Sequence, residues 1–245
     1  VGRITSGTFE HISERARGKI QGWSEKLLAC AGREVLLKSV VQAIATYPMS
    51  TFLLTKKVCK SLTSPMAKYF WSSSLDKNSM HWVSWNELAT PKCKGRMGFR
   101  DPHQFNLAML GKQGWRLMTN PTSLCARVLK GRYFLDGDFM HAPAPKSASA
   151  TWKAILAGRE ALGAGLIARV GDGSTISVWN DKWIAGTISM KPIFKPPNTT
   201  IETVDELIDT TNWSWRQDVL RETFIALDAE AILNIPIRQG GGEDS

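Results

Sequence analysis

The chain has 245 residues, of which 43% are hydrophobic, and its 31 Lys and Arg against 22 Asp and Glu give a net charge of +9. This length can bury a core in one large or two small domains, and the hydrophobic content excludes a disordered chain. No apolar run approaches the roughly 18 residues of a membrane helix, so we expect no membrane partner. The start, 1–4, has neither Met nor an apolar signal core, which indicates a cut or a continuation.

Helical periodicity dominates the first half of the chain. Apolar residues recur at steps of three and four from Phe9 to Leu27 and predict a first helix. A second is predicted over 33–46 and stopped by Pro48. A third is predicted from about Lys56, with Pro65 kinking or splitting it.

Capping signals predict the next helices. Ser84 stands at capping-box spacing before a short helix that ends before Pro91. Asp101-Pro102 combines an N-cap acceptor with proline at the first helical position. Asn120-Pro121 repeats this pattern, with Gly131 as the predicted end of that helix. Its predicted apolar face consists of Leu124, Cys125, Val128 and Leu129.

The pattern changes in the second half. A helix is predicted from Trp152 to Leu162, followed by a hairpin near 166–180 whose Asp172-Gly173 pair is typical of a type I′ turn. Two further capping boxes are predicted to open short acidic helices. They are Thr203 with Glu206, and Ser214 with Gln217.

These patterns predict a mainly α fold in which a helical bundle precedes a smaller α+β region with one β-hairpin. The predicted division is a basic helical region over 1–135, a linker over 136–150, an α+β region over 151–239 and a disordered tail over 240–245. The linker prediction rests on a mixture of Asp, Gly, Pro, Ala and Ser. The tail contains three consecutive glycines.

Charge is distributed unevenly along the chain. Residues 1–130 hold 20 basic and 7 acidic residues, a net charge of +13, whereas residues 131–245 hold 11 and 15, a net charge of −4. The basic half indicates a polyanionic partner, which we expect to bind this half and not the acidic one. A solvated basic face without a partner remains the alternative.

Residues for catalysis or metal binding are not grouped in the sequence. Two-metal phosphoryl chemistry needs clustered carboxylates, but Asp76 and Asp101 are the only aspartates of residues 1–130. Asp172 with Asp181 suggests a nuclease pair, although a turn explains Asp172-Gly173 better. The histidines, at 11, 81, 103 and 141, show no ligand spacing.

The four cysteines, at 30, 59, 93 and 125, form no close pair. Their spacing argues against a disulfide scaffold and a zinc knuckle, and favours a reducing intracellular compartment, the nucleus or the cytoplasm. Of the ten tryptophans, those at 23, 71, 82, 85 and 115 are predicted to be core residues, since tryptophan at helical spacing packs more often than it stacks on bases. Trp179 and Trp183 are predicted to pack the hairpin onto a helix.

Several segments resemble, in order, the region downstream of the palm in plant non-LTR (LINE-type) retrotransposon reverse transcriptases. The matching segments extend over nearly the whole chain, in an ordered spacing that makes the resemblance specific. They are Gly22-Trp23, 28–33, 37–40, 47–50 with Phe52, Phe70-Trp71, 95–101, Phe105-Asn106 with Ala108 and Leu110, Trp115-Arg116, 171–173, Trp179, Asp181 and Trp183. Departures are Ala29 in place of Ser, Thr55 in place of Pro, and Arg96 in place of a second Gly.

The resemblance implies the thumb and connecting region of an RNA-directed DNA polymerase. In this family the catalytic aspartates lie upstream, in a turn that this chain lacks, and a zinc-binding segment usually follows a stretch like 232–236. Mg²⁺ would therefore belong to the palm and Zn²⁺ to the downstream segment, so we expect no cofactor in this chain. The chain alone is expected to be inactive.

A thumb grips template–primer by its backbone, which favours Lys and Arg on helical faces. The implied partners are nucleic acid, as RNA, DNA or hybrid, and the remainder of the parent polyprotein. A degenerate relic or interaction domain with no retained activity is the alternative. The candidate binding residues are Arg15, Arg17, Lys19, Arg33, Lys38, Lys56, Lys57, Lys94, Arg96, Arg100, Lys112 and Arg116.

Arg33 and Lys38 match family positions. Arg33 stands at the predicted start of a helix, where its charge opposes the helix macrodipole. This placement suggests phosphate contact, with packing of its aliphatic stem on Trp23 as the alternative.

Overall fold

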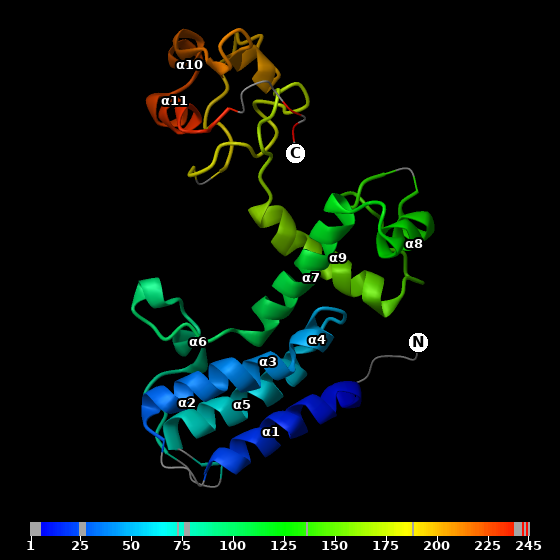
Figure 1. Cartoon of the computed structure of the whole chain (residues 1–245), viewed down its shortest axis with the longest axis vertical. Coiled ribbons are helices and arrows are strands. Elements are labelled where there is room, and N and C mark those ends of the chain that lie inside the picture. Colours follow the sequence, from blue (N-terminus) through cyan, green and yellow to red (C-terminus); the bar gives the residue numbers. More distant parts are fainter. Residues whose placement is uncertain are drawn as a thin grey trace. The chain divides into compact units, whose positions relative to one another are not determined.

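The computed structural model describes residues 6–24, 28–72, 74–75, 79–135, 137–187 and 189–237, together with Gly242 and Asp244. Leu27 and Asp76, named above, lie outside these residues. The chain divides into two compact units, Val1–Ala164 and Gly165–Ser245. Helices dominate the first, whereas the second combines loops and short helices with a two-stranded antiparallel hairpin (Figure 1). The predicted mainly α fold class with one hairpin is thereby confirmed.

The first unit consists of helices and the loops that join them, and no described helix is long and apolar enough to cross a membrane. Helix α1 packs against α5, and α5 also packs against α2 and α7. The elements are η1 (Ser6–Phe9), α1 (Glu10–Ser24), α2 (Cys30–Leu36), the π-helical turn η2 (Leu37–Val41), α3 (Gln42–Ile44), α4 (Thr46–Met49), α5 (Lys56–Ser72), α6 (Trp85–Leu88), η3 (Lys92–Lys94), α7 (Pro102–Thr119), α8 (Leu124–Tyr133) and α9 (Ala150–Gly165).

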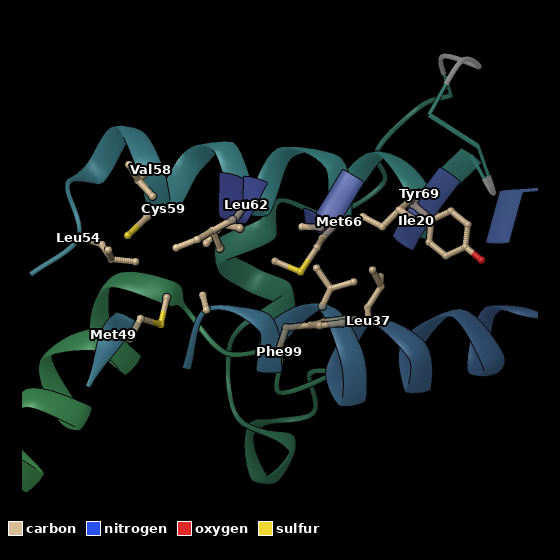
Figure 2. Close-up of a cluster of buried hydrophobic side chains, with 14 of the residues drawn as sticks. Ile20, Leu37, Met49, Leu54, Val58, Cys59, Leu62, Met66, Tyr69 and Phe99 are labelled. Carbon is tan, nitrogen blue, oxygen red and sulfur yellow. The ribbon is translucent and has the colours of Figure 1, made fainter. Parts of the chain in front are cut away.

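The predicted apolar stripe of α1 is buried. Ile12, Ala16 and Ile20 are at most 2% exposed, and they join Val58, Leu62 and other residues of α5 in one core (Figure 2). Trp23, Trp71 and Trp85 are partly buried against this core, as expected. In contrast, Trp82 is 77% and Trp115 46% exposed, so the prediction of core positions is wrong for both.

Prolines do not end the helices in the predicted way. The second helical segment begins at Cys30 and continues to Met49, past Pro48. Pro48 is tolerated because it lies in the first turn of α4, where a backbone N–H lacks an intrahelical acceptor. Helix α5 runs unbroken through Pro65, so the predicted splitting is wrong.

The caps agree with two of three predictions in this region. The Ser84 hydroxyl accepts a hydrogen bond from Glu87 N (3.3 Å), and the Asp101 carboxylate accepts one from Gln104 N (2.8 Å). The Asn120-Pro121 start is wrong, because the Asn120 N–H still bonds to the preceding helix at Arg116 O. Helix α8 begins after Ser123 and continues past Gly131 to Tyr133.

The predicted apolar face of α8 is also largely wrong. Leu124 and Val128 are 75% and 58% exposed, and Cys125 is exposed, whereas Leu129 packs partly against a core. Ala126, which is 3% exposed, is the buried residue of the helix.

The predicted linker at 136–150 is packed within the first unit. Phe139, Ala142 and Ala148 are buried around Trp152 of α9. Arg159 of α9 donates a hydrogen bond to Ala142 O (2.7 Å). The division between the compact units comes after this region, at Ala164. The division into 1–135, 136–150 and 151–239 stays a prediction.

Helices α7 and α9 cross at glycines (Figure 1). A Cβ atom on Gly158 would lie 2.3 Å from Gly111 N, and one on Gly111 would lie 3.0 Å from Gly158 O. The two backbones therefore approach as closely as they do because neither residue carries a side chain.

The second unit depends on side chains that bond to loop backbone. Its elements are η4 (Val204–Leu207), β1 (Ile208–Asp209), β2 (Ser214–Trp215), α10 (Gln217–Thr223) and α11 (Ala226–Leu233). Indole N–H groups of three buried tryptophans donate to backbone carbonyls: Trp179 to Ile201 (2.6 Å), Trp183 to Val178 (2.9 Å) and Trp215 to Ile235 (2.8 Å). Trp179 and Trp183 are thus buried, but the predicted hairpin at 166–180 that they were expected to pack onto a helix is not formed.

The hairpin lies at 208–215, where Ile208 pairs with Trp215, and not near 166–180. Gly173 has a left-handed φ of 82°, but Asp172 does not, so a type I′ turn is absent. The amide groups of the 171–175 loop bond to Gly242 and Asp244 of the tail, or locally, instead of to a second strand. For these two tail residues, the structure differs from the predicted disorder.

The two predicted capping boxes of this unit have opposite outcomes. The Glu206 carboxylate accepts hydrogen bonds from Thr203 N (3.1 Å) and Glu202 N (2.9 Å), and the capping box of η4 is complete. Ser214 instead lies in β2, and α10 begins after Arg216 without a side-chain cap. Strand pairing of Ser214 with Asp209 removes it from the helix start.

The glycine crossing gives a first stability prediction. Gly158→Ala should destabilise the chain by about 1–3 kcal/mol or more, because the added methyl group clashes with the α7 backbone. Gly131→Ala is the control, since a Cβ there meets nothing within 4 Å, and alanine should stabilise α8 by up to about 1 kcal/mol. Urea unfolding monitored by circular dichroism measures both. Equal midpoints for the two variants would contradict the close crossing.

The cysteines give a second prediction. Burial, with a further contribution from the charge of Asp101, raises the pKa of the Cys59 thiol to about 11. The thiolate is the reactive form, so Cys59 should react with the reagent DTNB at pH 8 only after unfolding. The exposed Cys30, Cys93 and Cys125 should react in the native chain. Cys59→Ala should leave the native thiol count at three, and four rapidly reacting thiols in the unmodified chain would contradict the burial.

Candidate nucleic-acid interface

The twelve predicted binding residues all lie in the first unit, on several elements. Ten are exposed, on α1, α5, η3, α7 and the adjoining loop, whereas Arg33 and Lys38 are half-buried. The structure thus separates ten exposed cations from two that are half-buried. The nucleic-acid role of the whole set stays a prediction.

Arg33 is positioned by the end of α5. Its Nη1 donates hydrogen bonds to Phe70 O (2.6 Å) and Tyr69 O (3.4 Å). These carbonyls belong to the last turn of α5, where a positive charge is favourable to the helix macrodipole. Because α2 begins at Cys30, Arg33 is not at a helix start, and the argument from an unfavourable charge is wrong.

Lys38 also has partners within the fold. Its Nζ forms an ion pair with Glu34 (2.7 Å), donates to Met97 O and lies 4.9 Å from the centre of the Phe99 ring. Lys38 therefore ties η2 to the 95–99 segment. These contacts explain a lysine at this position without a ligand.

The basic 92–100 segment has a defined backbone. Gly95 and Gly98 have left-handed φ angles of 75° and 64°, whereas Arg96 does not. The family's second glycine is therefore not needed at 96. Arg96 lies 3.7 Å from Glu87, and Arg100 stacks over the Phe105 ring at 4.7 Å.

The start of α5 carries exposed lysines beside the start of α7. Lys56 and Lys60 line a cavity of about 760 Å³ together with His103 and Gln104 of α7. Asp101 also lines it and reduces its positive charge. A smaller cavity, of about 240 Å³, brings Lys57 to Arg17 of α1, again beside acidic side chains.

The outward face of α7 combines cations with an aromatic ring. Lys112, Trp115 and Arg116 are exposed at steps of three and four, so they share one face of the helix. The opposite face, including Asn106, Leu110 and Gly114, is buried. Lys112 and Arg116, which were predicted to bind nucleic acid, thus share an exposed face with Trp115, which was predicted to be a core residue.

Polar groups continue beyond Arg116. A cavity of about 610 Å³ brings Arg116 and Gln113 to hydroxyl groups from three other segments. These hydroxyl residues are Ser50, Thr51, Thr122, Ser123 and Thr151. Hydroxyl groups and Arg are the kinds of donor that contact phosphate oxygens in protein–nucleic acid complexes.

Asn106 fixes α7 relative to the start of α5. The residue is fully buried, and its Oδ1 accepts a hydrogen bond from Leu54 N (2.7 Å). Its Nδ2 donates to Met49 O (2.7 Å) and Phe52 O (2.9 Å). The amide thus connects α7 to the turn that leads directly into Lys56 and Lys57.

The carboxylates considered for metal chemistry bond to nearby backbone. Asp172 Oδ1 accepts from Ser174 N (3.1 Å), and Asp181 Oδ2 accepts from Ser177 N (2.7 Å). The first interaction is typical of a turn, and the second fixes the backbone four residues earlier in the chain. No three His, Cys, Asp or Glu residues of the described ranges gather to hold a metal ion.

Comparison with known proteins identifies plant relatives. An uncharacterized mitochondrial protein of Arabidopsis thaliana is 40% identical over 152 residues, which are 62% of this chain and 99% of the relative. The chain belongs to the family of this mitochondrial protein. A second Arabidopsis thaliana relative, provisionally named a ribonuclease H protein, is 34% identical over 200 residues, which are 80% of this chain but 32% of that protein. No family model and no solved structure matches the chain.

Asn106 gives a prediction for the interface. Asn106→Ala should destabilise the chain by about 2–4 kcal/mol, because it leaves the buried Leu54 N–H and two carbonyls without their partner. Asn86→Ala, on the exposed surface of α6, is the matched control and should change stability by less than about 0.5 kcal/mol. Urea unfolding of both variants is the measurement, and a similar small loss in each would contradict the role of Asn106.

Proposed function

We propose that the chain is the non-catalytic region downstream of the palm of a plant LINE-type reverse transcriptase, and that its basic helical unit holds template–primer nucleic acid by backbone contacts. The ordered sequence segments support this origin. The relative named for ribonuclease H supports it too, since that activity concerns RNA paired with DNA, the product of reverse transcription. Under this proposal, Mg²⁺ belongs to the palm and Zn²⁺ to a following segment.

The distribution of charge between the two units supports nucleic-acid binding. Residues 1–164 hold 24 basic and 10 acidic residues, a net charge of +14, whereas residues 165–245 hold 7 and 12, a net charge of −5. A polyanion is therefore attracted to the helical unit and repelled by the other. Contacts to phosphate release counterions, which makes such binding sensitive to salt.

The outward face of α7 is the observation that carries the proposal. Lys112 and Arg116 provide charge for phosphates, and Trp115 between them provides an aromatic surface for an unpaired base or a sugar. Trp115 is 46% exposed between these two cations, so packing within the fold explains a tryptophan at this position poorly. Arg33 and Lys38, in contrast, act within the fold, so the ligand is assigned to the exposed members of the predicted set.

The salt dependence of binding should show whether the outward face of α7 contacts nucleic acid. The full chain should bind labelled RNA, DNA and hybrid oligonucleotides with log K falling linearly against log salt. Lys112→Ala with Arg116→Ala should flatten the slope by up to about two units. Trp115→Ala should weaken single-strand binding by about 1–3 kcal/mol and leave the slope nearly unchanged, because stacking releases no counterion. Fluorescence anisotropy at several salt concentrations measures these effects.

A double variant in the acidic unit is the matched control. Arg216→Ala with Arg221→Ala removes the same charge from exposed positions and should leave both affinity and slope unchanged. Binding that does not depend on salt, or equal losses in both double variants, would overturn the proposal. The relic or interaction domain without retained nucleic-acid binding would then be the better explanation.

A further inference from the structure

The 171–175 loop of the second unit surrounds a carboxylate with hydrogen-bond donors. Asp244 Oδ1 accepts from Gly171 N (2.7 Å) and Gly173 N (2.9 Å). Asp244 Oδ2 accepts from Thr175 N (3.0 Å) and Thr175 Oγ1 (2.9 Å). Both oxygens of one anion are thus held by four donors, three of which are backbone amides.

The shape of the loop is fixed by contacts other than those to Asp244. Gly173 is buried with a φ of 82°, and a Cβ there would lie 2.5 Å from Asp205 N. Asp205 N donates to Gly173 O (3.2 Å), and the Asp172 carboxylate holds Ser174 N. The amides therefore converge because the loop is packed against η4. Converging backbone amides of this kind form anion sites in proteins.

The bound carboxylate is held as an anion. Burial acts to raise the pKa of Asp244, but hydrogen bonds from Thr175, Gly171 and Gly173 outweigh it and leave the pKa below its usual range. The loop therefore favours negative charge. A phosphate group presents the same feature, a pair of charged acceptor oxygens on one centre.

The carboxylate is preceded in the sequence by a glycine-rich stretch. Asp244 follows Glu243 and three consecutive glycines at 240–242. Glycine loses more conformational freedom than any other residue when it is fixed. An anion supplied through such a segment is therefore open to replacement by one from solution.

Space for a larger ligand adjoins the loop. A cavity of about 650 Å³ is lined by Gly171 and Gly242, by the apolar side chains of Trp183 and Ile235, and by Arg169. Arg169 is exposed and would supply a cation to a phosphate bound beside the loop.

We propose that the 171–175 loop is a phosphate-binding site and that Asp244 is its intramolecular competitor. Phosphate bound there accepts from the amides of Gly171, Gly173 and Thr175 after the Asp244 carboxylate has left. The site is separate from the nucleic-acid face of α7 and does not depend on it.

The test is a titration of the full chain with inorganic phosphate at constant ionic strength, in which the backbone amide signals are monitored by NMR. In Asp244→Ala, the amide signals of Gly171, Gly173 and Thr175 should shift in a saturable way at millimolar phosphate. The unmodified chain should bind at least about twofold more weakly, since the tethered carboxylate competes with millimolar phosphate at a millimolar effective concentration. Glu230→Ala, which removes one exposed negative charge from the same unit, should behave as the unmodified chain does.

Titration with a 5′-phosphorylated dinucleotide and with its unphosphorylated form then distinguishes a nucleotide phosphate from the free anion. Asp244→Asn, which keeps one acceptor oxygen and the shape of the side chain, replaces Asp244→Ala if the latter loses its native spectrum. Absence of a saturable shift in the Asp244 variant, or the same affinity with and without Asp244, would overturn the proposal.

Discussion

The buried amide of Asn106 is the constraint on which the helical unit depends. A fully buried side chain that bonds to three backbone groups allows one relative position of α7 and the 49–54 turn. That position sets where α5 begins and which face of α7 is turned outward. Arg33 at the last turn of α5 and the glycine crossing with α9 complete the frame. The exposed cations are therefore carried by helices whose positions are fixed by other residues.

Local signals in the sequence predicted much of this frame. The α1 stripe, Ser84 and Asp101 were identified correctly because each acts within one or two turns of its own helix. The predictions of a helix start at Asn120-Pro121 and of a hairpin at 166–180 failed because the backbone amides concerned bond to other groups. The Asn120 N–H bonds to Arg116 O, and the Gly171 N–H bonds to the Asp244 carboxylate. For Arg33, the error came from placing the start of α2 three residues too late.

The candidate interface was predictable in composition but not in arrangement. Charge counts separate a basic from an acidic half, and ten of the twelve cations are exposed. The position of Trp115 was missed, although α7 contains a signal for it. Gly111 and Gly114 lack side chains, so another segment can pack closely over them. Their side of α7 is therefore buried, and Trp115 faces outward. Small residues can therefore orient a helix better than its largest apolar residue.

In the described residues of the second unit, irregular chain is held largely by side chains and only in small part by its two-stranded sheet. Three indole N–H groups and the carboxylates of Asp181 and Glu206 each satisfy loop backbone that would otherwise lack a partner. The 171–175 loop differs from these cases because its amides converge on one point and the group that fills it comes from the distant Asp244. The other pairs are closed by residues within about 22 positions in the sequence. Binding of this carboxylate restricts a glycine-rich stretch of the sequence, so the contact is open to exchange for an external anion.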